Sequence, residues 1–345
     1  MTQEPFDIVI PLYRLRWNTR AVLEGLTFHY SPRAIHIITP ATEVRSLQQH
    51  LEDWHVAPTT VHNEDTFFEE GCGLTKEMIC AQLDLQASLY NPGWFYQQLL
   101  KLGAFEGIPD LSEWYLVWDS DLLLVQPWPA FRKQEQTLQH SFALLQHNQW
   151  GNPQIVSKWA TWIHSVLAVE PLTDSTGTFV PHHMWFKQEH LKSFTRQLQS
   201  YYQSQEHWLL LMMRSANEFG TFSEYWAYVS WVAAQALADL SFYPYQQYGE
   251  TTERFFDDGT GLFSASLKQR LLTTTQASDL QSLNVEFSPS YHDVMSFIQT
   301  EYESGPLPSA LSFESSPRHL KKNKETMHIE ELRSRWNPRE VEASV

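Results

Sequence analysis

The chain has 345 residues, 42% of them hydrophobic and 14% aromatic, with a formal net charge of −16 at pH 7. This apolar and aromatic content predicts a folded globular protein and excludes an intrinsically disordered one. A strongly acidic surface repels the phosphate backbone of nucleic acids, so we expect no nucleic-acid partner. The two cysteines, Cys72 and Cys80, form neither a disulfide framework nor a zinc-ligand spacing.

The N-terminal sequence and the hydropathy predict a protein without a leader peptide or a membrane span. Residues 1–13, MTQEPFDIVIPLY, lack the basic region and the apolar stretch of about 7–15 residues that mark a signal peptide. No run of about 18 or more apolar residues occurs in the sequence. We therefore expect a soluble, cytoplasmic protein.

Strand and helix patterns alternate at the start of the chain. Apolar runs predict strands at 6–11, 34–40 and 60–63, and the spacing of apolar residues predicts helices at 19–30 and 46–54. Strand, helix and strand within about 35 residues form a βαβ unit, and such units build parallel sheets. The expected fold class is therefore α/β.

The next helix and strand carry the chemistry. A helix is predicted at 93–105, GWFYQQLLKLGAF, where Gln98 and Lys101 lie three residues apart and can meet one ligand. The strand WYLVW at 114–118 ends in Asp119, Ser120 and Asp121, and the apolar run LLLV follows at once. Further strands are predicted at 142–145, 179–180 and 241–245, and further helices at 188–202 and 225–238.

The two aspartates after the strand predict a metal site. Ligands of open α/β sheets bind at the carboxyl ends of the strands, and Asp119 and Asp121 point the same way if the backbone there is extended. Two hard oxygen ligands suit Mg²⁺ or Mn²⁺, which keep open positions for phosphate oxygens. The alternative is a strand end that turns into solvent with two exposed acids, but the apolar run that follows argues against it.

These motifs resemble the GT-A-fold glycosyltransferases that contain an Asp-x-Asp motif. QQLLKLGAF followed by YLVWDSDLLLVQP is similar to the core of the glycogenin and lipopolysaccharide glycosyltransferase group, and to an uncharacterised microbial family of the same fold. The resemblance covers residues 6 to about 130. It implies a Rossmann-like, mixed but mainly parallel central sheet flanked by helices, and a nucleotide-sugar donor, most simply a UDP- or GDP-sugar, bound with Mn²⁺ or Mg²⁺.

The resemblance also implies roles for residues of the first half. The opening strand, with Pro11 and Tyr13, would hold the base and ribose of the donor. Lys101 would reach the donor sugar or diphosphate, and Asp119 and Asp121 would hold the metal on the diphosphate. Gln98, Ser120 and Asp119 complete the predicted donor site. Residues 1–130 would thus form the nucleotide-sugar-binding half, residues 131–311 the acceptor-side half of the same domain, and residues 312–345 a charged C-terminal tail.

In the second half the resemblance implies an acceptor side. His182, His183 and Trp185 in FVPHHMWF are expected there, with Trp226 as a weaker candidate, and the acceptor is a sugar, a small molecule or a glycan. Ser223 is predicted to cap a helix, which places Glu224 in the first turn as general base. An acid favoured there by the helix dipole alone is the other interpretation. His292 is the candidate third metal ligand.

Two other functions stay open at this point. A phosphatase or phosphotransferase of the haloacid dehalogenase type also uses Asp-x-Asp after a strand, but on its first strand, whereas this motif falls past residue 115. A non-catalytic carbohydrate-binding module on a transferase scaffold is the second, although the intact Asp-Ser-Asp and Lys101 argue against decay. We expect a glycosyltransferase, hexosyltransferase-like, with its donor, acceptor and stereochemistry undetermined.

Overall fold

The computed structural model describes residues 5–127, 131–134, 137–142, 153–173, 179–180, 182–242, 252–256, 288–301 and 310–314. The chain divides into two compact units. The first comprises Met1–Arg14, Tyr30–Ser120 and Trp128–Gly249, and the second comprises Leu15–His29, Asp121–Pro127 and Glu250–Val345. No helix in the described ranges is long and apolar enough to cross a membrane.

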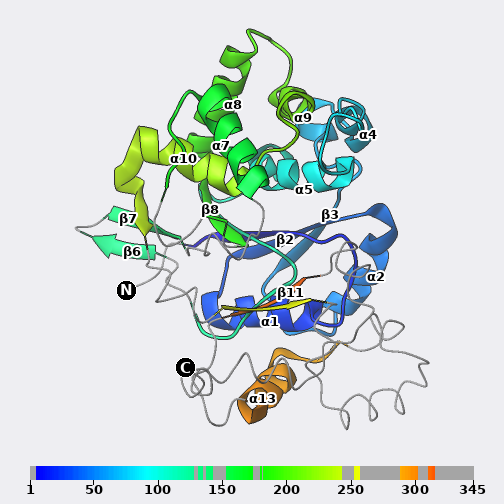
Figure 1. Cartoon of the computed structure of the whole chain (residues 1–345). Coiled ribbons are helices and arrows are strands. Elements are labelled where there is room, and N and C mark those ends of the chain that lie inside the picture. The colour runs from blue at the N-terminus through cyan, green and yellow to red at the C-terminus, as the bar shows by residue number, and fades with distance from the viewer. Residues whose placement is uncertain are drawn as a thin grey trace, which may run out of the picture. The chain divides into compact units, whose positions relative to one another are not determined.

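A five-stranded sheet forms the centre of the first unit (Figure 1). Its order is β3 (Thr59–Asn63), β2 (Ala34–Thr39), β1 (Asp7–Pro11), β4 (Trp114–Trp118) and β8 (His183–Lys187). Strands β1 to β4 are parallel, and β8 pairs antiparallel with β4. The predicted α/β class with a mixed, mainly parallel sheet is confirmed.

The central strands are apolar on both faces, which is typical of strands covered on both sides. All five residues of β1 are buried, and so are residues 115–118 of β4. Because successive side chains of a strand point to opposite faces, a continuous apolar run such as IVI or YLVW places apolar side chains on both faces of the sheet. The same runs identified these strands in the sequence, within one residue at each end.

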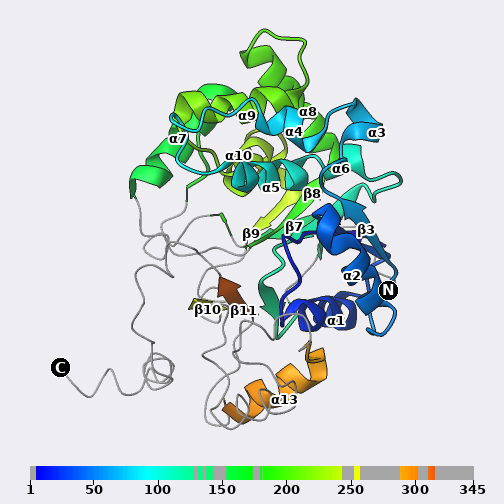
Figure 2. The same ribbon diagram turned by 90° about the vertical axis from the view of Figure 1, so that its right-hand side faces the viewer.

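Helices cover this sheet and share one core with it. Helices α5 (Pro92–Leu102), α7 (Pro153–Leu167), α8 (Gln188–Tyr201), α9 (Trp208–Phe219) and α10 (Glu224–Ala236) lie on one side of the sheet in both views (Figures 1 and 2). Their apolar side chains form a single cluster with Val9, Val117 and Phe186 of the sheet. In the described part of this unit, the remaining helices are α2 (Ala41–Leu51), α3 (Glu69–Cys72), α4 (Lys76–Cys80), α6 (Ala104–Gly107) and a 3₁₀ turn at Leu237–Asp239.

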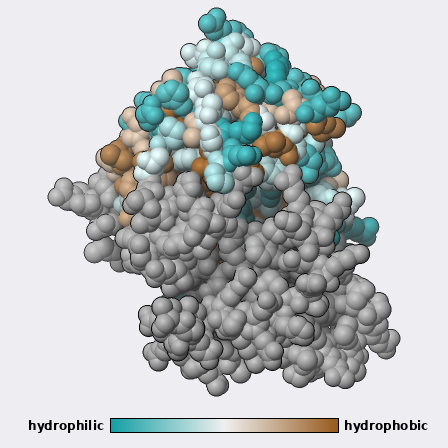
Figure 3. All heavy atoms as spheres, in the orientation of Figure 1, coloured by the Kyte–Doolittle hydropathy of each residue, from teal (hydrophilic) through white to brown (hydrophobic). Residues whose placement is uncertain are grey.

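The surface of the described helices is mixed in character. In Figure 3 hydrophilic residues prevail at the top of the molecule, and apolar ones form small separate patches. Met78 and Leu85 are among the large apolar side chains that are exposed. Small exposed apolar patches of this kind are normal on protein surfaces.

Smaller elements complete the two units. In the first unit, β6 (Phe131–Gln134), β7 (Thr137–Phe142) and β9 (Leu240–Phe242) form a three-stranded sheet. In the second, β5 (Leu122–Leu124), β11 (Ala310–Glu314) and β10 (Thr252–Phe256) form another. Helix α1 (Thr19–Tyr30) lies in the second unit except for Tyr30, as does α13 (Tyr291–Glu301). The Tyr291 N–H donates to Glu24 at 2.8 Å and ties α13 to α1.

Several predicted elements need correction. Helix α2 begins five residues earlier than predicted, and the helix predicted at 93–105 ends at Leu102. Gly103 follows, where a Cβ would lie 2.7 Å from the Phe68 ring, and α6 then begins at Ala104. Residues 179–180 form no strand. Helices α7 and α9 were not predicted.

The described residues cover only part of the predicted C-terminal tail and of two predicted strands. Strand β11 runs through the predicted start of the tail at Ser312, and Ser312 is buried. The rest of that tail, and residues 143–145 and 243–245 of two predicted strands, lie outside the described residues. The predicted division at residue 130 stays a prediction.

A buried polar network fixes the amino end of the sheet. Asp7 donates its N–H to Ser112 Oγ at 2.8 Å and accepts from the Ser112 N–H at 2.9 Å and from Arg33 Nε at 2.8 Å. Burial alone would raise the pKa of Asp7, but hydrogen bonds from His36, Arg33 and Ser112 hold it well below its usual range. The ionised carboxylate therefore joins β1 to the segment that leads into β4.

A histidine pair lies beside this network. His36 Nδ1 and His62 Nε2 are 3.1 Å apart on the neighbouring strands β2 and β3. Burial and the nearby His36 lower the pKa of His62 to about 4. The folded protein thus keeps His62 neutral at a pH where the unfolded chain protonates it.

We expect the free energy of unfolding to fall as the pH drops from about 6.5 to about 4, because the unfolded state binds the His62 proton first. In His62→Gln this part of the loss disappears, so the difference in stability between pH 7 and pH 4.5 shrinks by about 1–2 kcal/mol. Urea denaturation at both pH values measures it. The matched control is His55→Gln, at an exposed histidine, which should keep the wild-type dependence. An equal effect of both substitutions would contradict the assignment.

Candidate active site

Asp119 lies at the carboxyl end of the central strand β4. The carboxyl ends of β1, β2 and β3 lie at the same edge, since these strands run parallel to β4. The Asp119 N–H donates to the His182 carbonyl at 2.9 Å, which continues the β4·β8 pairing by one step. Crevices at this edge of an α/β sheet are where such folds bind ligands.

A buried lysine occupies the space beside Asp119. Lys101, in the last turn of α5, is 5% exposed. Its Nζ lies 2.7 Å from Asp119 Oδ1 and 2.8 Å from Glu224 Oε1. Burial alone would lower the pKa of Lys101, but the two carboxylates raise it well above its usual value. The ammonium group stays charged and bridges the end of β4 to the start of α10.

Asp119 is held by three side chains. Besides Lys101, Tyr225 donates its hydroxyl to Oδ1 at 2.9 Å, and His182 Nδ1 lies 3.2 Å from Oδ2. Burial would raise the pKa of Asp119, but Lys101 and His182 lower it far below its usual range. The Tyr225 ring also stacks against the ammonium of Lys101, with Nζ 4.4 Å from its centroid. Asp119 is therefore ionised and fixed in direction.

Glu224 enters the cluster from the first turn of α10. The Ser223 side chain accepts from the Trp226 N–H, which confirms the predicted cap and places Glu224 just inside the helix. Gln98 Oε1 accepts from the Glu224 N–H at 3.2 Å, so Gln98 and Lys101 both contact Glu224, while their predicted meeting at one ligand stays a prediction. Gln98 Nε2 is buried and makes no hydrogen bond within the described part of the chain.

His182 has an unusual backbone conformation. Its φ is 62°, in the left-handed region that non-glycine residues seldom occupy. Such a conformation costs about 1 kcal/mol or more and persists where surrounding contacts impose it. Here the pairing of the His182 carbonyl with Asp119 and the contact of its ring with the same residue impose it. In this conformation the imidazole Nδ1 lies 3.2 Å from Asp119 Oδ2.

The other predicted residues lie in different surroundings. Pro11 ends β1, and Tyr13 is 75% exposed in the loop after it. His183 is buried opposite Trp118 in the β4·β8 ladder. Trp185 is 2% exposed and packs edge-on against Phe6, with centroids 4.6 Å apart, so it presents no free ring face to an acceptor among the described residues.

Trp226 is likewise committed to the core. It is 3% exposed, and its indole N–H donates to the Leu172 carbonyl at 2.7 Å. The sequence reasoning named both tryptophans and missed Tyr225, the residue between Glu224 and Trp226. A tyrosine one position after a helix-start acid carries no signal by itself, because only the fold brings its hydroxyl to Asp119.

The backbone after Asp119 is not extended as expected. Ser120 and Asp121 form a turn between β4 and β5. Asp121 begins a segment of the second unit, and His292 is exposed in α13 of that unit. Metal binding by Asp121 and His292, like donor binding by Pro11, Tyr13 and Ser120, stays a prediction.

Solved structures similar to this chain include three glycosyltransferases. Mouse xyloside xylosyltransferase 1 in its apo form is 9% identical, with a TM-score of 0.41, covering 90% of this chain and 98% of that one. Core-mannan synthase A of Aspergillus fumigatus in its Mn/GDP form is 8% identical, with a TM-score of 0.42 and coverages of 70% and 73%. The galactosyltransferase LgtC with donor and acceptor sugar analogs is 8% identical, with a TM-score of 0.32 and coverages of 90% and 88%.

These TM-scores all lie below 0.5, so no residue role is transferred from these structures. No curated protein sequence matches the chain. Residues 16–260, more than half of the chain, match a family described as a family of unknown function, DUF6492, and the chain belongs to this family.

Proposed function

We propose that this protein is a metal-dependent glycosyltransferase of the GT-A type, which moves a sugar from a nucleotide-sugar donor to a sugar, small-molecule or glycan acceptor. One observation carries the proposal: Lys101, Asp119 and Glu224 form a buried charged cluster at the carboxyl edge of a parallel sheet. One positive and two negative charges leave it with a net charge of −1. A cation beside Asp119 would therefore be attracted to it.

The residues near Asp119 fit a divalent metal. Asp119 and His182 offer a carboxylate and an imidazole 3.2 Å apart, and Asp121 follows two residues along the chain. Carboxylate and imidazole donors suit Mn²⁺, and carboxylates also suit Mg²⁺. We propose His182 as the third ligand in place of the exposed His292, because His182 already contacts Asp119. When bound, such an ion neutralises charge on the diphosphate leaving group.

The chain's own side chains then have distinct tasks. Lys101 and Tyr225 keep the Asp119 carboxylate ionised and oriented, which pre-organises the site before the donor arrives. Gln98 Nε2 makes no hydrogen bond in the described part of the chain, so its N–H groups could donate to an oxygen of the nucleotide sugar. Glu224 is held by Lys101 through Oε1, and Oε2 is the oxygen that would take a proton.

A reaction with inversion uses Glu224 as base. The acceptor oxygen bonds to the anomeric carbon while the bond from that carbon to the diphosphate oxygen breaks, and the acceptor proton passes to Glu224. The electron pair of the broken bond leaves with the nucleoside diphosphate. If Glu224 proves dispensable for transfer, a retaining route is favoured instead.

The phosphatase alternative fits this geometry poorly. A haloacid dehalogenase needs its aspartate on the first strand and free to attack phosphorus. Here Asp119 follows β4, and Oδ1 is engaged by both Lys101 and Tyr225. A non-catalytic binding module would not require a buried acid at the acceptor side, and the cost of burying Glu224 argues for its use.

The first test is a thermal-shift series with UDP, GDP, CDP, ADP and dTDP, each with Mn²⁺ and with chelator. We expect one nucleotide at about 100 times its Kd to raise the Tm by roughly 3–6 °C, only when Mn²⁺ is present. Asp121→Asn should lose the shift, because it removes a metal ligand. Asp53→Asn, at an exposed carboxylate, is the matched control and should keep it. A normal shift in Asp121→Asn would refute the metal site.

Glu224→Gln separates binding from transfer. The amide keeps the shape but cannot take a proton, so we expect nucleotide binding to persist while release of nucleoside diphosphate from the sugar nucleotide slows about 100-fold or more. Glu77→Gln is the control, since Glu77 also lies in the first turn of a helix but is exposed. Unchanged turnover in Glu224→Gln would remove Glu224 from the role of base.

Tyr225→Phe tests the pre-organisation of Asp119. The substitution keeps the ring over Lys101 and removes the hydroxyl that binds Oδ1. We expect Mn²⁺-dependent nucleotide affinity to fall about tenfold, measured by calorimetry, with the fold intact. Tyr228→Phe is the matched control, because it removes a buried hydroxyl on the same helix that accepts from the Lys187 N–H instead. Equal losses in both variants would indicate a general effect on α10.

A further inference from the structure

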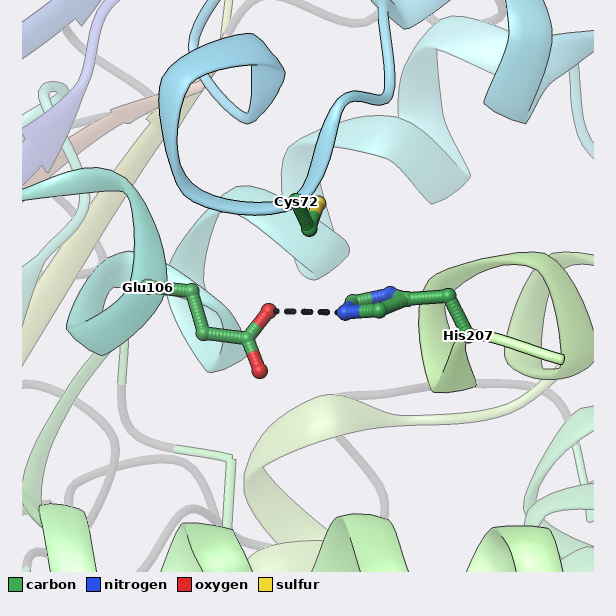
Figure 4. Close-up of side chains that lie close together, drawn as sticks. All are labelled: Cys72, Glu106 and His207. Carbon is green, nitrogen blue, oxygen red and sulfur yellow. Dashed lines mark ion pairs between the residues drawn. The ribbon is translucent and has the colours of Figure 1, made fainter. Parts of the chain in front are cut away.

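A second group of potential metal ligands lies in the first unit and shares no residue with the Asp119 cluster. Cys72 ends α3, Glu106 lies in α6, and His207 caps the start of α9. One ligand atom from each lies within 4.8 Å of the other two. Figure 4 shows the three side chains converging from three separate segments, with Cys72 beside the Glu106–His207 pair. A thiol, a carboxylate and an imidazole thus meet at one point.

The close approach of α3 to α6 is built into the sequence. A Cβ on Gly71 would lie 2.3 Å from the Glu106 carbonyl oxygen, so only glycine allows the two helices to pack this closely. Cys72 follows Gly71 directly and is thereby brought to the Glu106 side chain. The spacing of the two cysteines in the sequence gave no sign of a metal site, because the other two ligands come from distant segments.

The Glu106 carboxylate is held by one oxygen and has its other oxygen directed at His207. Glu106 Oε1 accepts from the Trp208 indole N–H at 3.0 Å, which fixes the direction of the group. Oε2 is shielded from solvent, accepts no hydrogen bond in the described part of the chain, and lies 3.3 Å from His207 Nε2. Outer hydrogen bonds of this kind commonly hold metal ligands in place.

The distances suit a tetrahedral ion. Zinc bonds of about 2.0–2.3 Å to oxygen, nitrogen and sulfur place neighbouring ligand atoms about 3.3–3.6 Å apart. The Glu106–His207 separation already has this value, and the 4.8 Å limit on the others leaves about 1 Å to close.

We propose that Cys72, Glu106 and His207 bind one Zn²⁺ ion, with water at the fourth position. Mixed sulfur, nitrogen and oxygen ligands favour Zn²⁺ over Mg²⁺ or Mn²⁺, which prefer oxygen. Binding releases the thiol proton to solvent, and the sulfur no longer donates to the Phe68 carbonyl.

Binding through Nε2 also has a small cost. The proton of the neutral imidazole moves to Nδ1, which ends the 3.4 Å hydrogen bond that the Leu209 N–H donates to it and with it the cap of α9.

A surface cavity adjoins the ligand group at Glu106. A surface cavity of about 390 Å³ is lined by Gly71, Glu106, Asp110 and Gln188 among others. Glu106 thus belongs both to the cavity wall and to the ligand group. The site would connect α3, α6 and α9 on the helical side of the first unit.

Cobalt titration of the full-length protein tests this proposal. The protein is stripped with chelator, and Co²⁺ is added while the near-ultraviolet thiolate-to-cobalt band is recorded. We expect one equivalent to produce the band and Zn²⁺ to abolish it by displacement. The Asp119 site contains no cysteine, so the band reports on this site alone, whatever the outcome for the proposed transferase.

Matched variants identify the ligands. Cys72→Ser should lose the band and bind Zn²⁺ at least tenfold more weakly, while Cys80→Ser, at the other half-buried free thiol, should match wild type. His207→Asn keeps a capping side chain on α9 and removes the imidazole, so it should lose affinity with the fold intact. The proposal is overturned if wild type shows no band, if Cys80→Ser loses it, or if Cys72→Ser and His207→Asn bind Zn²⁺ normally.

Discussion

The candidate active site depends on one buried ammonium group. Lys101 is almost fully shielded from water, and an isolated charge there would be very costly. Two carboxylates within 2.8 Å compensate it, and removal of Lys101 would leave both carboxylates uncompensated in the interior. Lys101 thereby joins α5, the end of β4 and the start of α10. The three elements hold their functional groups in one geometry because none can separate without exposing a bare charge.

Packing of the apolar core positions Lys101 and Glu224. Phe95 and Leu99 lie on the buried face of α5, and Lys101 follows in its last turn, next to the carboxyl end of β4. Helix α10 packs against α5 and begins with a serine cap that sets the position of Glu224. Tyr225 then reaches back to Asp119 from the same turn. Local capping chemistry and global packing thus act together on a site that includes Gln98 and Glu224, which are 126 residues apart.

Sequence reasoning succeeded where a local pattern has one physical meaning. Continuous apolar runs such as IVI and YLVW indicate buried parallel strands, and Ser223 before Glu224 indicates a helix start. It failed where the pattern is ambiguous. Helix α9 begins with WLLLMM, an unbroken apolar run with no period, and the helix around Lys101 was extended past Gly103 because its break depends on a distant ring, Phe68. The helical period of α7 is present in the sequence at Val156, Trp159 and Ile163, but it was not recognised.

The sequence by itself determined the fold class and the positions of the central strands, and it placed Gln98 and Lys101 three residues apart on one helix, because these follow from apolar periodicity and from spacing within one element. Only the tertiary structure decided which residues meet across elements. It brought Tyr225 and His182 to Asp119, buried Trp185 in the core, and assembled Cys72, Glu106 and His207 from three segments. The physical reason is that such contacts arise from packing over long sequence separations, which no local pattern encodes.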